Sequence, residues 1–103
     1  MTNSEIIKKT ALDTLNLESR AISNLSKIID SNFCEIVELL MNCKGKIILT
    51  GIGKSAIIGM KIVATLNSTG SPAIFMHAGE ALHGDLGIIQ KNDIVIFFSN
   101  SGE

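Results

Sequence analysis

The chain has no excess of charge of either sign, no long apolar run and no leader-like beginning. Its 103 residues carry 9 Lys and Arg against 10 Asp and Glu, a net charge of −1. There is no basic patch of the kind that nucleic-acid binding needs, and no apolar run approaches the roughly 20 residues that cross a membrane. The first five residues lack the basic and apolar regions of a signal peptide. We expect a cytoplasmic protein with neither a nucleic-acid nor a membrane partner.

Cysteine is also scarce, with only Cys34 and Cys43 in the sequence. We expect both on one helix, where a separation of nine residues puts them on opposite faces and prevents their pairing. Their spacing matches no zinc motif. Because free cysteine is often buried, we predict two buried structural thiols.

The sequence does contain enough apolar residues, 46%, to build one small domain with a core. Residues 3–29 are predicted to form a helix that starts with a Thr2–Glu5 capping box. Asp30 to Asn32 break this helix and cap the next, which ends near Gly45. We treat 1–44 as an N-terminal helical segment. The apolar stripe of the first helix is nearly heptad-like, and it packs either on another subunit or on the chain's own sheet; its members are Ile7, Ala11, Leu15, Ile22, Leu25 and Ile29.

From residue 45 onward the pattern alternates between short apolar strands and helices. Strands are predicted at 47–49, 73–76 and 94–98, with a helix at 54–68 and a short helix at 78–83. The strands lack polar alternation, so we expect them to be buried on both faces of a parallel sheet. The predicted fold is α/β, with two N-terminal helices followed by a three-stranded parallel sheet over 45–103.

Two of these strands run directly into loops of small and hydroxyl-bearing residues. Gly51 to Ser55 follow the first strand, and Ser99 to Glu103 follow the third. In a parallel sheet such loops lie at the carboxyl edge, where ligands bind, and their N–H groups and hydroxyls can hold a phosphate. Lys54 adds a cation there. The alternative, equally open from the loop alone, is that Ser55 only caps the helix and Lys54 is solvated.

Two familiar nucleotide motifs do not account for the first loop. A Walker A loop requires glycine at position 48, where the sequence has Ile48 inside a strand. Gly51, Gly53 and Ala56 formally satisfy the dinucleotide fingerprint, but the second strand ends at His77 without the acidic residue that binds the ribose. The sequence therefore argues against an ATPase and against a nicotinamide or flavin site.

A second candidate segment, residues 77–87, holds two imidazoles, two carboxylates and three glycines. His77 and His83 suit proton transfer or metal binding because histidine titrates near neutral pH. The simpler alternative is that His77 ends a strand and His83 caps a helix. The concentration of polar groups at the ligand edge of the sheet favours a functional role.

Together these blocks resemble the sugar isomerase (SIS) domain of arabinose 5-phosphate isomerases. The resemblance is carried by Gly51-x-Gly-Lys-Ser55, Asn67-Ser-Thr-Gly70, His77-Ala-Gly-Glu-Ala-Leu-His-Gly-Asp-Leu-Gly87 and Ser99-Asn-Ser-Gly-Glu103, over residues 40–103. It implies a doubly wound sheet of five strands, usually followed by two CBS domains. It implies an isomerase that interconverts D-ribulose 5-phosphate and D-arabinose 5-phosphate, for the synthesis of the Kdo of lipopolysaccharide. Such enzymes are homo-oligomers, so we expect a dimer or tetramer.

The resemblance also implies roles for individual residues. Lys54 and His83 are the catalytic candidates, and no cofactor is required. His77 stands at a zinc-binding position where zinc inhibits. The candidate substrate-binding residues, some from the resemblance and some from the loops themselves, are Gly53, Ser55, Gly70, Ser71, His83, Ser99 and Ser101.

The sequence departs from the family pattern by stopping early. The family's next acidic residue, its last two strands and its CBS domains lie beyond Glu103. We therefore expect residues 1–103 alone to be inactive. Two alternatives stay open: a non-catalytic sugar-phosphate-binding module or regulator, and an inert fragment.

Overall fold

The structure is a computed structural model, and it describes residues 1–79 and 85–99. Internal contacts divide the chain into two compact units, Met1–Val37 and Glu38–Glu103. This division lies ahead of the predicted boundary between residues 44 and 45. Each unit is described by itself below.

The first unit begins with helix α1, Asn3–Asn24, followed by the 3₁₀ helix η1, Leu25–Ile28. The predicted capping box is confirmed: Glu5 N donates to Thr2 Oγ1 at 3.2 Å, and Thr2 N donates to Glu5 Oε2 at 2.9 Å. The prediction gave a single helix over 3–29, whereas in the structure the α-helix gives way to a 3₁₀ helix after Asn24. It ends at Ile29, whose backbone is extended.

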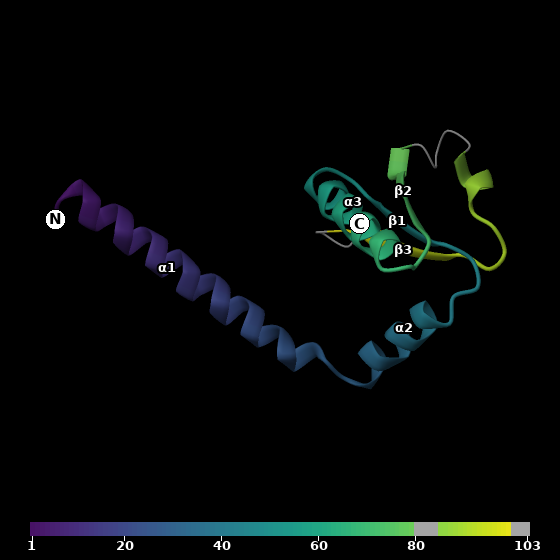
Figure 1. Ribbon diagram of the computed structural model, residues 1–103, viewed down its shortest axis with the longest axis horizontal. Coiled ribbons are helices and arrows are strands. Elements are labelled where there is room, and N and C mark those ends of the chain that lie inside the picture. The colour runs from purple at the N-terminus through teal and green to yellow at the C-terminus, as the bar shows by residue number, and fades with distance from the viewer. Residues whose placement is uncertain (80–84, 100–103) are drawn as a thin grey trace. The chain divides into compact units, whose positions relative to one another are not determined.

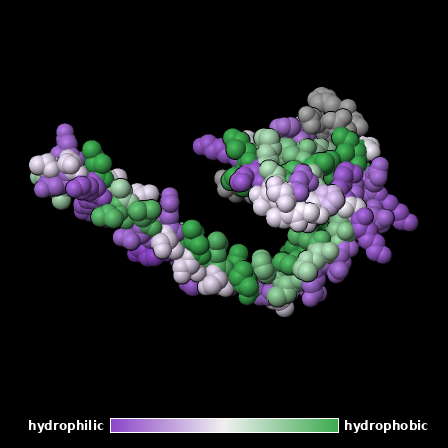
Figure 2. Space-filling model, viewed as in Figure 1, coloured by the Kyte–Doolittle hydropathy of each residue, from purple (hydrophilic) through white to green (hydrophobic). Residues whose placement is uncertain are grey.

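Helix α2, Ser31–Met41, starts at the predicted break. Asp30 Oδ1 accepts a hydrogen bond from Phe33 N at 3.0 Å, as expected of a side chain that caps a helix. None of the residues of α1, η1 and α2 is buried. Figure 2 shows apolar side chains on the surface of α1. Of the helices that the structure describes, none is long and apolar enough to span a membrane.

The second unit is built on a parallel sheet of three strands (Figure 1). The strands are β1, Ile47–Gly51, β2, Ala73–His77, and β3, Ile94–Phe98, in the order β2-β1-β3. Their register places Gly51 beside His77 on one side and beside Phe98 on the other. The predicted α/β class, with two leading helices and three parallel strands, is confirmed.

Helix α3, Lys54–Ser68, has the predicted bounds and packs on one face of this sheet. Three buried residues, Ile47, Leu49 and Ala73, form the core with partly buried apolar side chains around them. All five residues of β1 are buried. The central strand is therefore buried on both faces, as predicted.

The prediction that every strand is buried on both faces is wrong for β3. Val95 and Phe97 are 43% and 51% exposed, whereas Ile96 and Phe98 pack against the core. The cause is position: β3 lies at an edge of the sheet, and the face that carries Val95 and Phe97 is opposite to the face that α3 covers.

The prediction for the cysteines is also wrong. Helix α2 ends at Met41, so Cys43 lies outside the helix that contains Cys34. Cys34 is exposed on α2, which has no buried residue. Cys43 is half-buried, with its Sγ at 3.8 Å from Lys46 O and 3.6 Å from Asn92 O.

A clamp at the amino edge of the sheet joins β1 to β3. The carboxylate of Asp93 accepts hydrogen bonds from Lys46 N at 2.9 Å, from Lys46 Nζ at 2.6 Å and from Gln90 N at 2.7 Å. Lys46 Nζ also donates to the carbonyl of Ile88, the last residue of the 3₁₀ helix η2, Asp85–Ile88, at 2.9 Å. Gly45 lies so close that a Cβ there would be 2.7 Å from Asn92 O. The clamp therefore needs a glycine beside it.

This clamp makes stability depend on pH in a defined window. The hydrogen bond from the Lys46 side chain, together with those from the Lys46 and Gln90 backbone, lowers the pKa of Asp93 from 3.8 to about 2. A carboxylate with a lowered pKa stabilises the fold above its unfolded pKa, and this contribution is lost as the pH falls through the folded pKa. We expect Asp93→Asn to lower the urea midpoint at pH 7, and the difference from wild type to shrink between pH 4 and pH 2.

Asp13→Asn is the matched control. Asp13 forms an exposed ion pair with Lys9 at 2.7 Å, and such pairs contribute little. Urea unfolding of the two variants at pH 7, 4 and 2 tests the clamp. An Asp93→Asn variant as stable as wild type at pH 7, or a difference that stays constant down to pH 2, would show that the clamp does not contribute.

Candidate functional site

The strand order β2-β1-β3 identifies the part of the sheet where a ligand fits. The chain leaves β1, passes through α3 to β2 on one side, and returns to β3 on the other side of β1. In open α/β sheets, ligands bind outside the carboxyl ends of the strands at such a switch point, between the first and third strands for this order. The loops that follow Gly51 and Phe98 are therefore the candidate site.

The loop after β1 has a backbone that suits an anion. Gly53 has φ 65° and ψ −133°, which only glycine adopts without strain, and it is the N-cap of α3 with no side-chain cap hydrogen bond. The alternative in which Ser55 caps the helix is therefore not what the structure shows. The first N–H groups of a helix have no partner within it, and with the helix dipole they attract an anion.

The Lys54 and Ser55 side chains lie at this helix end. Lys54 is the first residue of α3 and is exposed, while Ser55 is half-buried. Over residues 1–79 and 85–99, no carboxylate forms an ion pair with Lys54. Lys54 is therefore an available cation at a helix start that has no side-chain cap, and the arrangement suits a phosphate.

The loop after β3 contributes Ser99, which is exposed and directly follows Phe98. Because Phe98 is paired with Gly51, Ser99 begins its loop next to the loop that contains Gly53. The structure thus brings Gly53, Lys54, Ser55 and Ser99 to one edge. Two other predicted site residues, His83 and Ser101, lie outside the described residues, as does most of the predicted helix over 78–83.

His77 stands at the same edge, at the end of β2 beside Gly51. Its side chain is exposed, and its ring contacts that of Phe75 edge to face, with centroids 4.9 Å apart and planes at 79°. Within the described ranges, no three His, Cys, Asp or Glu side chains are grouped as metal ligands. Zinc in proteins is almost always bound by three or four side chains. These residues therefore do not form a zinc site around His77, and its zinc role stays a prediction.

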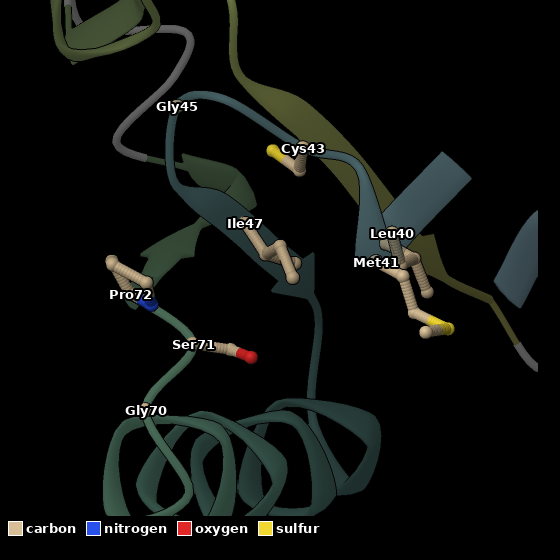
Figure 3. Close-up of a pocket in the computed structure, with 8 residues that line it drawn as sticks. All are labelled: Leu40, Met41, Cys43, Gly45, Ile47, Gly70, Ser71 and Pro72. Carbon is tan, nitrogen blue, oxygen red and sulfur yellow. The ribbon is translucent and has the colours of Figure 1, made fainter. Parts of the chain in front are cut away.

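Gly70 and Ser71 lie at the other end of the sheet. They precede β2, which from Ala73 to His77 spans four steps of 3.3 Å, or roughly 13 Å, before it reaches the carboxyl edge. Both line a cavity of about 140 Å³ at the amino edge, shown in Figure 3. The lining residues are Leu40, Met41, Cys43, Gly45, Ile47, Gly70, Ser71 and Pro72. Within one chain, the structure does not bring Gly70 and Ser71 together with Lys54.

The Asn67–Gly70 block has a structural role that the sequence did not reveal. The Asn67 amide pairs with both backbone groups of Ala73: Nδ2 donates to Ala73 O at 3.0 Å, and Ala73 N donates to Oδ1 at 2.8 Å. Gly70 closes the turn with φ 92°. This side chain joins the end of α3 to the start of β2. An asparagine six residues before a strand is too weak a signal to predict such pairing.

Comparisons with known proteins identify the family of the chain. Residues 39–103 match the family model of the SIS domain. The chain belongs to the SIS domain family. It is 46% identical over 99 residues to arabinose 5-phosphate isomerase GutQ of Shigella flexneri, an alignment that covers 96% of this chain and 31% of that protein. It is 53% identical over 91 residues to arabinose 5-phosphate isomerase KpsF of Escherichia coli O6:H1, covering 87% of this chain and 28% of that protein.

A solved structure shows the same fold in a ligand complex. Escherichia coli CFT073 c3406 in complex with arabinose 5-phosphate aligns with a TM-score of 0.86 and 42% identity, over 100% of this chain and 54% of that one. This SIS chain spans about a third of the length of the curated relatives named above. The SIS family and its α/β fold, both expected from the motifs, are confirmed.

Proposed function

We propose that this SIS chain belongs to an isomerase that interconverts D-ribulose 5-phosphate and D-arabinose 5-phosphate, the reaction expected in Kdo and lipopolysaccharide synthesis. The observation that carries the proposal is the loop between β1 and α3, where Gly53 leaves the helix N–H groups uncapped and Lys54 has no ion-pair partner among the described residues. The names of the relatives and the arabinose 5-phosphate complex of c3406 support a pentose phosphate as the ligand.

The chemistry requires three kinds of group. Aldose–ketose isomerisation moves a proton from C1 of the ketose to C2 of the aldose through a cis-enediol, while the carbonyl and hydroxyl oxygens exchange a proton. It needs a base, a group that stabilises the developing oxyanion, and an anchor for the phosphate. The phosphate anchor and the cation are the two functions for which the described residues are suited.

In this proposal the N-terminus of α3, Ser55 and Ser99 hold the phosphate, and Lys54 stabilises either the phosphate or the oxyanion. His83 opens the sugar ring or carries a proton. The base is supplied by a residue that is not assigned, and no cofactor is required. Three further expectations stay predictions: inhibition by zinc at His77, inactivity of the 103 residues alone, and a cytoplasmic location.

A non-catalytic sugar-phosphate-binding module is the second candidate. The observation in its favour is that no carboxylate accompanies Lys54, Ser55, His77 and Ser99 among the described residues of this edge.

Activity can be tested in a chimera in which residues 1–103 replace the matching segment of E. coli KpsF, which is 53% identical. In this chimera we expect Lys54→Ala to lower kcat about 10²–10³-fold, the usual effect of removing a group that stabilises an oxyanion. Lys54 is exposed and supports no core, so the free energy of unfolding should change by less than about 0.5 kcal/mol. Measuring kcat and Tm on the same sample separates the two effects.

Lys61→Ala is the control, because Lys61 is an exposed lysine on the same helix, two turns from the loop. It should change neither kcat nor Tm. A Lys54→Ala chimera with normal kcat would remove Lys54 from the site. A chimera that binds arabinose 5-phosphate without turnover would favour the binding module over the isomerase.

We also propose that the chain forms a homo-oligomer, a dimer or a tetramer, through the stripe of α1. Ile7, Leu15 and Ile22 are 68%, 62% and 69% exposed, and the helices of the first unit contain no buried residue. Such an exposed apolar stripe on a helix usually marks an interaction surface. We expect sedimentation velocity to show a dimer or larger species, and Leu15→Lys with Ile22→Lys to shift it towards monomer.

Asn16→Lys introduces one lysine on the opposite, polar face of α1, which carries Lys9, Asp13 and Arg20, and is compared with Leu15→Lys alone. This control should leave the sedimentation profile unchanged. A wild-type chain that sediments as a folded monomer at all concentrations would rule out self-association.

A further inference from the structure

Three residues between α3 and the face of the sheet that it covers, Gly59, Phe75 and His77, form a row from the core to the carboxyl edge. Gly59 lies in the middle of α3 and is buried. Phe75 lies in β2 and is half-buried against the core. His77 follows two residues later on the same face of β2, because side chains alternate along a strand, and is exposed at the carboxyl edge.

Gly59 leaves the space that the Phe75 ring occupies. A Cβ at position 59 would lie 2.8 Å from Cε2 and 3.1 Å from Cδ2 of Phe75, closer than two carbon atoms approach without a shift. The nearest atom of the other neighbouring ring, Cε2 of Phe98, is 3.5 Å away, an ordinary contact. Any larger residue at 59 would therefore displace Phe75 first.

Phe75 in turn contacts His77. The two ring centroids are 4.9 Å apart and the planes meet at 79°, an edge-to-face arrangement that aromatic pairs favour. An exposed side chain at the end of a strand would otherwise sample several rotamers. Contact with a ring that is itself fixed in the core reduces this freedom on the side of the ligand loops.

We propose that Phe75, seated by Gly59, is a positioning residue that orients the imidazole of His77 toward the carboxyl edge. The inference rests on the proposed function in one respect, namely that this edge is where the sugar phosphate binds. A side chain held in one orientation before the ligand arrives does not lose rotamer freedom on binding. Phe75 thus links the packing of α3 to the geometry of the candidate site.

The competing explanation is that Phe75 only fills the core. Loss of stability cannot separate the two, because replacing a partly buried phenylalanine destabilises a core in either case. The experiment therefore needs a signal from His77 itself. The chain contains two histidines, so the ring signals in a ¹H–¹³C spectrum are assigned by His77→Asn alone.

Phe75→Leu and Phe98→Leu are the matched pair, compared with wild type in the 103-residue chain. Both remove a phenylalanine ring that packs on the core beside Gly59, but Phe98 has no ring contact with His77. We expect the Phe75 ring current to displace the His77 ring signals in wild type and in Phe98→Leu. In Phe75→Leu they should move to the position of an unstacked histidine. Gly59→Ala should shift them too, because its Cβ pushes the Phe75 ring aside.

His77 signals that are the same in wild type and Phe75→Leu would overturn the proposal, as would an equal change in Phe98→Leu. This measurement needs no ligand and no turnover, so it tests the contact between Phe75 and His77 even if the proposed isomerase function fails, and the double-mutant cycle below tests the positioning role. It also tolerates a loss of stability, because the signals of the folded chain are observed directly.

The KpsF chimera gives a second test by a double-mutant cycle. If Phe75 acts through His77, Phe75→Leu should raise KM or lower kcat for arabinose 5-phosphate in the chimera that retains His77. It should have no further effect in the His77→Asn background. The effect of Phe98→Leu should be the same in both backgrounds. A Phe75→Leu effect that persists undiminished without His77 would contradict the positioning role.

Discussion

The arrangement of the second unit depends on the carboxylate of Asp93. One oxygen accepts the backbone N–H of Lys46, and the other accepts the Lys46 ammonium and the N–H of Gln90. These contacts join the residue before β1 to the residue before β3, 47 positions later in the sequence. The hydrogen bonds to this carboxylate are charge-assisted, which makes them stronger than neutral ones. Because the strands are parallel, fixing their first residues also fixes where they end.

The amino and carboxyl edges of the sheet differ in how their polar groups are used. At the amino edge polar groups are paired: Asp93 with Lys46, and the Asn67 amide with both backbone groups of Ala73. At the carboxyl edge the polar groups face outward, with Lys54 exposed and the N-cap of α3 occupied by a glycine that offers no side-chain acceptor. One edge holds the strands in register, and the other carries the loops that we propose as the ligand site.

Much of this architecture was predictable because its signals are local. The Thr2–Glu5 capping box, the break at Asp30 and the bounds of α3 follow from residues within a few positions of one another. The loop at Gly53 was recognisable because its glycines and Lys54 directly follow an apolar run. The failures concern long-range contacts. Burial of Val95 and Phe97 depends on what covers each face of an edge strand, which an apolar run of five residues does not encode.

The candidate site was predictable to a similar extent. Sequence reasoning identified Lys54, Ser55 and Ser99 from loop composition, and the register of β1 and β3 then placed them at one edge. It took Gly70 and Ser71 from the resemblance and did not use their place before β2, which in a parallel sheet puts them at the opposite edge. Nor did it find the pairing of Asp93 with Lys46, the Asn67 amide or the contact between Phe75 and His77, each of which exists only once strands and helix have packed.

The central claim is that the loop between β1 and α3 binds the phosphate of a pentose phosphate. The most direct measurement is a titration of the ¹⁵N-labelled chain with arabinose 5-phosphate, followed by the amide signals of Lys54 and Ser55. These amides should shift saturably, those of Gly45 and Asn92 at the amino edge should not, and arabinose without phosphate should have no effect. If arabinose 5-phosphate leaves Lys54 and Ser55 unchanged, or shifts Gly45 and Asn92 instead, the phosphate site is not at this loop.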